Sequence, residues 1–371
     1  MGKRAHGEGS IFQRKDGRWC ASLRLDSGKR KAYYGKTQKD VQGKLRAAQR
    51  TIDDGLPLSS DRQRVGAFLD RWLCDVAEPT VRPSTYTRYR EILLGHVAPT
   101  LGQRPLAKLT PQDLSALYTS KLREGLAPRT VGHIHRVLHR ALRDALRWGL
   151  VARNVCDAVS PPKVPRAEMQ VLTPEQARDL LAAAAGDPLE ALYVLAITTG
   201  MRQGELIGLK WQDFDAGRLT VHRTVRHMIG LGAVEGEPKS ARGRRSLRLT
   251  PMAISALKLH RARQTEQRLR AVFWDDLGLI FTNEVGRHLS PQNLTRRSFQ
   301  PLLQRAGLPT VRFHELRHTA ATLMLLQGVN VKVVSEMMGH SNIAITLDVY
   351  SHVLPTMQAD AADKMEKLLA I

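Results

Sequence analysis

The sequence has few of the features that mark secreted and membrane proteins. Its 371 residues include only three cysteines, and Cys20, Cys74 and Cys156 fit no metal-binding spacing. We therefore expect buried or inert thiols in a reducing cytoplasm. The chain contains no apolar run long enough to span a bilayer, and residues 1–8 lack the apolar stretch of a secretory signal. These absences predict a cytoplasmic protein with no membrane partner.

Acidic residues are scarce relative to basic ones, which leaves a large positive charge. Lysine and arginine total 57 against 35 aspartates and glutamates, a formal net charge of +22 with a pI of about 10.5. A membrane-binding protein could also be basic, but no lysine-rich amphipathic anchor stands out. The excess is spread through folded-looking segments and favours arginine, whose planar guanidinium suits bidentate contacts with phosphate. Nucleic acid is therefore the expected partner.

The first 58 residues are strongly basic in their own right. They contain three short β-prone runs, at residues 9–12, 18–25 and 30–34. A helix is expected to follow over residues 37–52. We predict a small three-stranded sheet with one helix over residues 1–58, able to lay a strand face in a DNA groove. Arg18 and Arg24 are its candidate DNA contacts, and a solvated basic arm without specificity is the alternative.

Residues 59–160 have the pattern of an all-helical domain. Apolar residues recur at three- and four-residue intervals in four stretches, at residues 65–76, 84–97, from 110 and from 128. The fourth helix is expected to bury an apolar stripe that ends at Trp148. Its other face carries Arg136, Arg140 and Arg143, which either contact DNA or are only solvated.

A proline-rich stretch at residues 161–165 predicts a linker, and residues 166–371 predict a larger, mostly helical domain. Within it, residues 219–225 alternate like a strand, and residues 246–249 look like the partner strand. The apolar side chains of residues 356–371 fall on one face of a terminal tail helix. The predicted fold class is multidomain, mainly α with small antiparallel sheets (α+β).

Tyrosine is absent between residues 194 and 349, which isolates Tyr350 near the end of the chain. Cations and histidines precede it in three short runs: Arg202, His314, Arg317 and His340. A phenol, with an ordinary pKa of about 10, needs help to become a nucleophile. A phosphodiester gains negative charge on its oxygens as it is attacked. Such a set therefore suits the attack of a tyrosine on DNA without a metal.

Four runs in this order resemble the sequence boxes of the tyrosine recombinase, or phage integrase, family. They read Thr-Gly-Met-Arg-Gln-Gly-Glu-Leu, His-Glu-Leu-Arg-His-Thr, Met-Gly-His and Thr-Leu-Asp-Val-Tyr-Ser-His. The resemblance covers residues 165–371. Residues 61–160 are similar to the helical core-binding domain of that family, and residues 1–55 to the arm-binding sheet domain of some integrases.

The resemblance implies a role for each reactive residue. Arg202 and Arg317 would clamp the non-bridging oxygens of the scissile phosphate. Tyr350 would attack phosphorus and form a 3′-phosphotyrosyl link, which stores the phosphodiester energy so that rejoining needs no ATP. Lys239, in a Glu-Pro-Lys-Ser run between the two predicted strands, matches the family's β-hairpin lysine, the usual general acid.

The remaining site residues would support this chemistry. His314, three residues before Arg317 on a helix, would orient or deprotonate the phenol or hydrogen-bond the phosphate. His340 would supply another hydrogen bond to the phosphate. Glu205 lies one helical turn after Arg202, where its carboxylate could hold the guanidinium or a neighbouring histidine. No cofactor and no metal are expected.

Three other functions fit parts of the sequence. A type IB topoisomerase shares the chemistry but relaxes supercoils as a monomer, whereas two upstream DNA-binding modules suit recognition of distinct sites. A DNA-binding regulator with inactive chemistry would not need all the reactive positions. Residues 314–318 also fit the zinc peptidase motif His-Glu-x-x-His, with Glu336 downstream as a third ligand. Arg317, however, would place a fixed charge beside the metal.

The family resemblance also implies partners. The substrate would be double-stranded DNA at attachment sites, which the chain would integrate or excise for a phage or mobile element. The resemblance implies a homotetramer on DNA in the nucleoid of a bacterial host, with a DNA-bending protein and an excisionase as accessory factors. The tail helix over residues 356–371 would dock on a neighbouring protomer or pack on its own.

Overall fold

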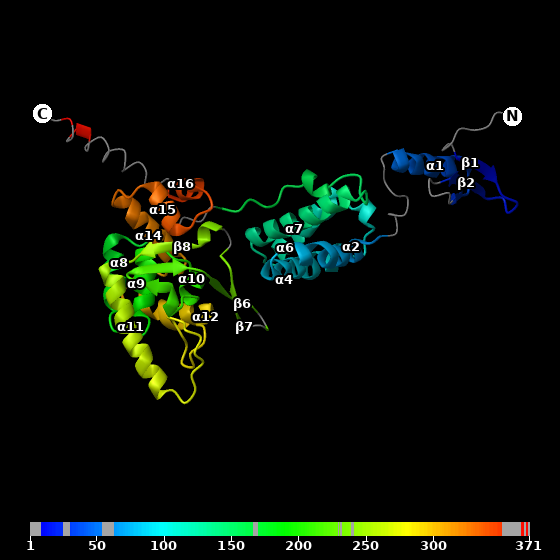
Figure 1. The fold of residues 1–371 in the computed structure, drawn as a ribbon. Coiled ribbons are helices and arrows are strands. Elements are labelled where there is room, and N and C mark those ends of the chain that lie inside the picture. Colours follow the sequence, from blue (N-terminus) through cyan, green and yellow to red (C-terminus); the bar gives the residue numbers. More distant parts are fainter. Residues whose placement is uncertain are drawn as a thin grey trace. The chain divides into compact units, whose positions relative to one another are not determined.

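A computed structural model of the chain divides into two compact units, Met1–Arg166 and Ala167–Ile371 (Figure 1). The structure describes residues 9–24, 30–53, 63–165, 170–228, 230, 232–238, 241–350, 365–366 and 369. Among these residues, no helix is both long enough and apolar enough to cross a membrane. The finer predicted boundary at residue 58 stays a prediction. The predicted tail helix over residues 356–371 lies almost wholly outside the described residues.

The N-terminal segment forms the predicted three-stranded sheet with one helix. Strands β1 (Ser10–Gln13), β2 (Trp19–Arg24) and β3 (Arg30–Gly35) are antiparallel in that order. Helix α1 (Gln38–Asp53) packs on this sheet. Ala21 and Leu23 of β2 and Val41 and Leu45 of α1 are buried together, because alternate residues of a strand share one face.

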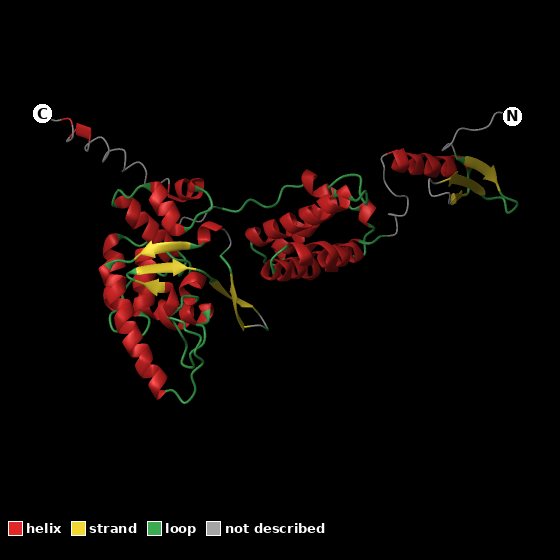
Figure 2. Ribbon diagram, viewed as in Figure 1, coloured by secondary structure: helices red, strands yellow, loops and turns green. Residues whose placement is uncertain are grey.

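The rest of the first unit is helical, as predicted (Figure 2). Its helices, with η marking a 3-10 or π-helical turn, are α2 (Val65–Trp72), η2 (Leu73–Ala77), α3 (Glu78–Thr80), α4 (Pro83–Ile92), η3 (Leu93–Val97), α5 (Ala98–Leu101), η4 (Leu106–Lys108), α6 (Pro111–Arg123), α7 (Pro128–Arg147) and η5 (Val155–Ala158). Thr110 begins α6 with a capping box, in which its hydroxyl accepts from the Asp113 backbone N–H and the Asp113 carboxylate accepts from the Thr110 N–H.

Helix α7 buries an apolar stripe against α2, α4 and α6. The Trp72 indole N–H donates to Asp144 Oδ2 at 2.8 Å and ties α2 to α7 inside this core. The predicted end of the stripe is wrong, because Trp148 is 48% exposed. The helix ends at Arg147, and the partly exposed Trp148 ring covers the buried Phe68, with the two ring centroids 6.2 Å apart and the planes at 72°.

The second unit is mostly helical around two small sheets. Its helices are α8 (Pro174–Ala183), α9 (Glu190–Thr199), α10 (Gln203–Ile207), η6 (Trp211–Asp213), η7 (Ala241–Gly243), α11 (Pro251–Arg270), α12 (Pro291–Asn293), η8 (Leu294–Phe299), α13 (Gln300–Arg305), α14 (Glu315–Leu326), α15 (Val331–Met338) and α16 (Ile343–Tyr350). Its strands are β4 (Phe214–Asp215), β5 (Arg218–Val221), β6 (Thr224–Met228), β7 (Gly232–Gly236) and β8 (Arg245–Arg248). This architecture confirms the predicted mainly α class with small antiparallel sheets.

The predicted strand over residues 219–225 is two strands in different sheets. β5 joins β4 and β8, with Leu219 opposite Leu247, while β6 pairs only with β7. The chain changes sheets at Arg223. Its guanidinium donates to the buried Asp213 carboxylate and, at 3.1 Å, to the Gly208 carbonyl. This buried ion pair interrupts the strand at Arg223, and the alternation of residue types in the sequence could not predict it.

Helix α9 is the centre of the second unit. Nearly all its side chains are buried, and it contacts α8, α11 and α14. It ends at Gly200, whose φ of +61° is the left-handed conformation typical of a glycine after a helix. A Cβ on Gly200 would lie 2.7 Å from the sulfur of Met338. The glycine therefore lets α15 approach the end of α9, where the candidate site lies.

Candidate active site

Four predicted site residues meet where α9, α14 and α15 end or begin. Arg202 precedes α10, and His314 and Arg317 lie on the first turn of α14. His340 follows Gly339, which ends α15 with a φ of +63°. Arg202 donates to the Gly339 carbonyl and Arg317 to the Met338 carbonyl, directly before His340, and His314 begins the helix that carries Arg317.

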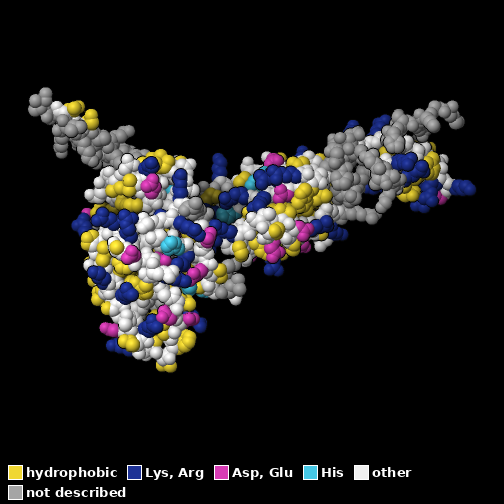
Figure 3. Space-filling view, in the orientation of Figure 1, with side chains coloured by type: hydrophobic (Ala, Val, Ile, Leu, Met, Phe, Trp, Pro, Cys, Tyr) yellow, Lys and Arg dark blue, Asp and Glu magenta, His cyan; other side chains and the backbone are white. Residues whose placement is uncertain are grey.

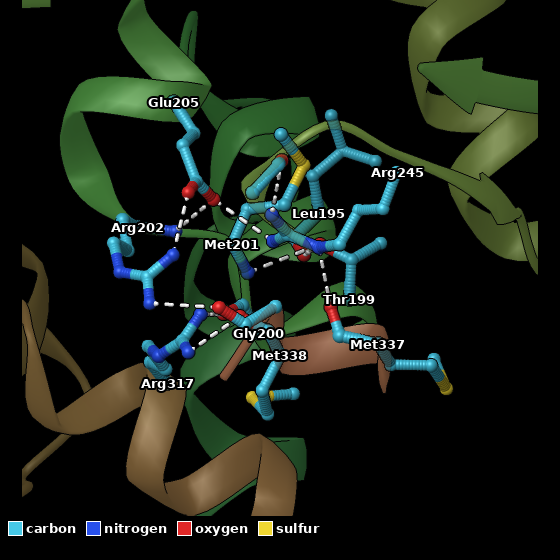
Figure 4. Close-up of polar contacts among 12 residues, drawn as sticks. Leu195, Thr199, Gly200, Met201, Arg202, Glu205, Arg245, Arg317, Met337 and Met338 are labelled. Carbon is cyan, nitrogen blue, oxygen red and sulfur yellow. Dashed lines mark hydrogen bonds and ion pairs between the residues drawn. The ribbon is translucent and has the colours of Figure 1, made fainter. Parts of the chain in front are cut away.

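Three arginines donate hydrogen bonds to the backbone carbonyls at the C-terminal end of α15 (Figure 4). The bonds run from Arg245 Nε to the Met337 carbonyl at 2.6 Å, from Arg317 Nη2 to the Met338 carbonyl at 2.6 Å, and from Arg202 Nη2 to the Gly339 carbonyl at 3.3 Å. The last carbonyls of a helix lack partners within the helix and form the negative end of its dipole. The end of α15 therefore holds the guanidinium groups together despite their mutual repulsion.

Glu205 pairs with two of these arginines. Its Oε1 accepts from Arg202 Nη1 at 2.8 Å, as its helical spacing predicts, and its Oε2 accepts from Arg245 Nη2 at 2.8 Å. Oε2 also accepts from the Arg202 backbone N–H at 3.0 Å. Burial disfavours the charge of this carboxylate, but the hydrogen bond and charge of Arg245, together with Arg202, hold the pKa of Glu205 below its ordinary value. Glu205 is therefore ionised and fixed.

The two predicted clamp arginines differ in exposure. The Arg202 side chain is 38% exposed, so part of its guanidinium faces solvent. Arg317 is 4% exposed, and its Nη1 donates to the Gly200 carbonyl at 2.8 Å in addition to the bond with Met338. Arg202 can thus meet a phosphate directly, whereas Arg317 brings its charge from within the protein.

The histidines of the site are neutral near pH 7. Partial desolvation of His314, with repulsion from Arg317 and Arg202, lowers its pKa. Burial, followed by the charges of Arg317 and Arg202, lowers the pKa of His340 to about 4. Burial and the neighbouring His314 lower the pKa of His318 to about 4. A neutral imidazole can accept a proton or donate a single hydrogen bond.

One contact fixes the orientation of His340. Its Nδ1 lies 2.8 Å from the hydroxyl oxygen of Thr346, which is buried in α16. This hydrogen bond leaves Nε2 as the ring nitrogen with which His340 can meet another group. It also joins the turn after α15 to the helix that ends at Tyr350.

Two predicted residues are not fully described. Lys239 lies outside the described residues, between Pro238 and η7. Tyr350 is the last residue of α16, but its side chain lies outside what the structure describes. Within η7, Arg242 Nη1 donates to the Ser341 carbonyl at 2.8 Å, which attaches η7 to the turn that carries His340.

The candidate DNA contacts lie in the first unit, and Figure 3 shows lysine and arginine side chains on the visible faces of both units. Arg18 is exposed and pairs with Asp16 at 3.0 Å, and Arg24 is exposed at the end of β2. Arg136 and Arg143 are exposed on α7.

Arg140, the remaining candidate on α7, is already engaged within the protein. Its Nη1 donates to the Tyr89 hydroxyl at 3.1 Å, and its guanidinium carbon lies 5.6 Å from the centroid of that ring. This contact holds the cation in place on the α7 face, between α4 and α7.

Arg245 is the site residue that the sequence reasoning missed. Alternation along β8 carried the signal, because Arg245 shares the inward face of the strand with Leu247, which is buried. An arginine at an inward position needs a carboxylate partner, and Glu205 is that partner.

The two histidines of the zinc-peptidase motif are both described. The rings of His314 and His318 lie 5.2 Å apart, centroid to centroid. Within the described ranges, no group of three or more His, Cys, Asp or Glu side chains is arranged to hold a metal.

Comparison with known proteins identifies the class. The model of the phage integrase family matches residues 170–357, and that of its N-terminal SAM-like domain matches residues 65–122. A XerC-like tyrosine recombinase of Caldanaerobacter subterraneus subsp. tengcongensis is 30% identical over 93% of this chain and 94% of its own length. An integrase of Streptomyces ambofaciens is 31% identical over 97% of this chain and 96% of its own length.

Solved structures share the fold. The Tn1549 transposon integrase in complex with a circular intermediate DNA matches with a TM-score of 0.66 and 24% identity, over 82% of this chain and 99% of that one. A lambda integrase dimer bound to a core site matches with a TM-score of 0.58 and 19% identity, over 94% of this chain and 96% of that one. The chain belongs to the phage integrase family. It is a tyrosine-type site-specific DNA recombinase, and these matches favour neither a relaxing topoisomerase nor a zinc peptidase.

Proposed function

We propose that Tyr350 is the nucleophile with which this recombinase cleaves and rejoins DNA during the integration or excision of a phage or mobile element. Its phenolic oxygen attacks phosphorus, the bond from phosphorus to the 5′-oxygen breaks, and a 3′-phosphotyrosyl link remains. One observation carries this assignment. Arg202, Arg317 and His340 converge at the end of α15, and the next helix, α16, ends at Tyr350.

The arginines stabilise the charge that develops on the phosphate. Arg202, the more exposed of the two, donates to a non-bridging oxygen. Arg317, which is buried, adds a fixed positive charge from within the protein. Donors held in place before the reaction act strongly, because they need not reorganise as charge grows. Glu205 and the helix carbonyls provide this preorganisation.

The histidines and Lys239 handle protons and the remaining phosphate contacts. His314 is neutral and partly exposed, so it can accept the phenolic proton of Tyr350 or orient that hydroxyl. His340, held by Thr346 through Nδ1, offers Nε2 to the phosphate. Lys239 protonates the leaving 5′-oxygen. No step needs a metal or another cofactor.

We further propose that four copies assemble on two DNA duplexes in the bacterial cytoplasm. A likeness to a lambda integrase tetramer bound to a Holliday junction supports this assembly. The sheet and helices of the first unit contact the DNA through Arg18, Arg24, Arg136, Arg140 and Arg143. Residues 356–371 dock on a neighbouring protomer, and a DNA-bending protein and an excisionase assist the reaction.

Trapping the covalent intermediate tests the proposed nucleophile. Direct repeats that flank the mobile element define the core site. A duplex of that sequence with a nick near the cleavage position releases the 5′-hydroxyl strand after cleavage, so the DNA cannot be rejoined and the adduct accumulates. The wild-type protein should form a covalent adduct in EDTA, while Tyr350→Phe binds the same DNA without forming one. Adducts of Tyr350→Phe at the wild-type level would refute the assignment, and loss of the reaction in EDTA would refute a metal-free mechanism.

A separate deletion tests the tail. Removing residues 356–371 should abolish tetramers on paired core sites in native gels while single-site binding persists. Unchanged tetramer formation would mean that this segment packs on its own protomer.

A further inference from the structure

Arg245 is buried beside Arg202 and Arg317. Its side chain is 7% exposed. Each of its three side-chain nitrogens donates to a protein acceptor: the Met337 carbonyl, Glu205 at 2.8 Å and the Gly243 carbonyl at 3.2 Å. The guanidinium is therefore held among protein acceptors and turned away from solvent.

Through Glu205, Arg245 acts on the exposed clamp residue. The Glu205 carboxylate has its two oxygens divided between the arginines, with Oε1 on the Arg202 guanidinium and Oε2 on Arg245 and the Arg202 backbone. Without Arg245, Oε2 would lose one of its two donors, and the Arg202 guanidinium and backbone N–H would have to hold the carboxylate. The direction of the Arg202 donors would then be fixed less firmly, although Arg202 itself would remain.

Through Met337, Arg245 also acts on the turn that carries His340. Arg245 holds the Met337 carbonyl, and Arg242 holds the Ser341 carbonyl. Between these two bonds the turn packs closely on the 242–245 segment, since a Cβ on Gly339 would lie 3.0 Å from both the Arg242 carbonyl and Arg245 Nη1. The position of His340 thus depends on the start of β8.

We propose that Arg245 is a positioning residue, which sets the direction of the Arg202 guanidinium and the place of His340 by joining Glu205 to the end of α15. This inference rests on the proposed function, because it concerns the same phosphate site. The link also ties the start of β8 to the turn that leads into α16. Arg202 and the turn before the nucleophile's helix therefore share one buried guanidinium.

The test compares Arg245→Gln with Arg244→Gln, a matched control. Arg244 is 59% exposed and pairs with Glu237 at the surface. Single-turnover adduct formation is measured on saturating nicked core-site DNA, and DNA affinity is measured separately. Misplacing a catalytic group by about 1 Å can slow a reaction about 100-fold. We therefore expect Arg245→Gln to cleave about 100-fold more slowly with DNA affinity within about threefold of wild type, and Arg244→Gln to match the wild type.

Two further variants keep the result decisive. Arg245→Lys should be about tenfold slower than the wild type, because one ammonium cannot hold both Glu205 and Met337 in the fork geometry. It carries the test alone if circular dichroism shows that Arg245→Gln is unfolded. Arg245→Gln should slow cleavage less when it is introduced into the Glu205→Gln variant than when it is introduced into the wild type. The reason is that much of the effect of Arg245 passes through Glu205.

Several outcomes would overturn the inference. These are wild-type cleavage by folded Arg245→Gln or by Arg245→Lys, a loss of DNA affinity as large as the loss of rate, and fully additive effects with Glu205→Gln. A wild-type protein that forms no adduct would instead contradict the proposed function itself.

Discussion

The different burial of Arg202 and Arg317, the two proposed clamp arginines, predicts that their removal has different consequences for stability. Arg317→Ala would leave the buried carbonyls of Gly200 and Met338 without their donors. Each such loss costs about 1–3 kcal/mol, and relief of repulsion with Arg202 offsets part of the total. We expect a net loss of about 3 kcal/mol, which lowers the melting temperature of a unit of this size by about 6–12 °C.

Arg202→Ala should be much milder for stability. Glu205 keeps Arg245 as its partner, and the Arg202 side chain is 38% exposed, so the lost pair is worth about 0–1 kcal/mol. Arg202→Ala should slow adduct formation by roughly 100- to 1000-fold, the usual effect of removing a transition-state donor, and Arg317→Ala should also slow it through the loss of its fixed charge. Differential scanning fluorimetry and the nicked-substrate assay would be run on the same samples. Equal melting temperatures for the two variants would refute the burial argument.

Three other predictions follow from the same geometry. Thr346→Val should slow cleavage about tenfold at unchanged DNA affinity, because His340 loses the partner that orients it; a wild-type rate would contradict this role. The depressed pKa values of His318 and His340, both about 4, mean that the unfolded chain binds more protons below pH 6.5. The urea midpoint of unfolding of the second unit should therefore be constant above pH 6.5 and fall as the pH drops towards 4. The fall should be less steep in His340→Gln. A midpoint independent of pH would show that the histidines are not buried in the neutral form. DNA affinity should fall steeply with salt, since a chain of net charge +22 releases counterions from many phosphates, and a flat salt response would contradict that electrostatic contribution.

Local sequence signals predicted much of the fold. The predicted helical stretch from residue 110 coincides with the start of α6, where Thr110 forms a capping box with Asp113. The period of apolar residues gave α7 and its buried stripe. These features depend on contacts within one turn or one helix, and such contacts are visible in a linear sequence.

Features that depend on distant residues were not predictable in this way. The break between β5 and β6 follows from the ion pair of Arg223 with Asp213. The burial of Arg317 depends on the Gly200 carbonyl, 117 positions away. Spacing could identify Arg317 as a candidate but could not show that its guanidinium is buried.

The candidate site shows the same division. The sequence runs identified Arg202, His314, Arg317 and His340, and the fold brings these four together. Arg245 belongs to none of those runs. Only the pairing of β8 with β5 and the approach of α15 place its guanidinium on Glu205 and Met337.

Identification of the residue that is bound to DNA tests the central claim most directly. The adduct formed by the wild-type protein on nicked core-site DNA would be digested with nuclease and protease and then analysed by mass spectrometry. We predict a nucleotide joined through its 3′-phosphate to Tyr350. A linkage to another residue, or to a 5′-phosphate, would contradict the assigned nucleophile and the direction of attack.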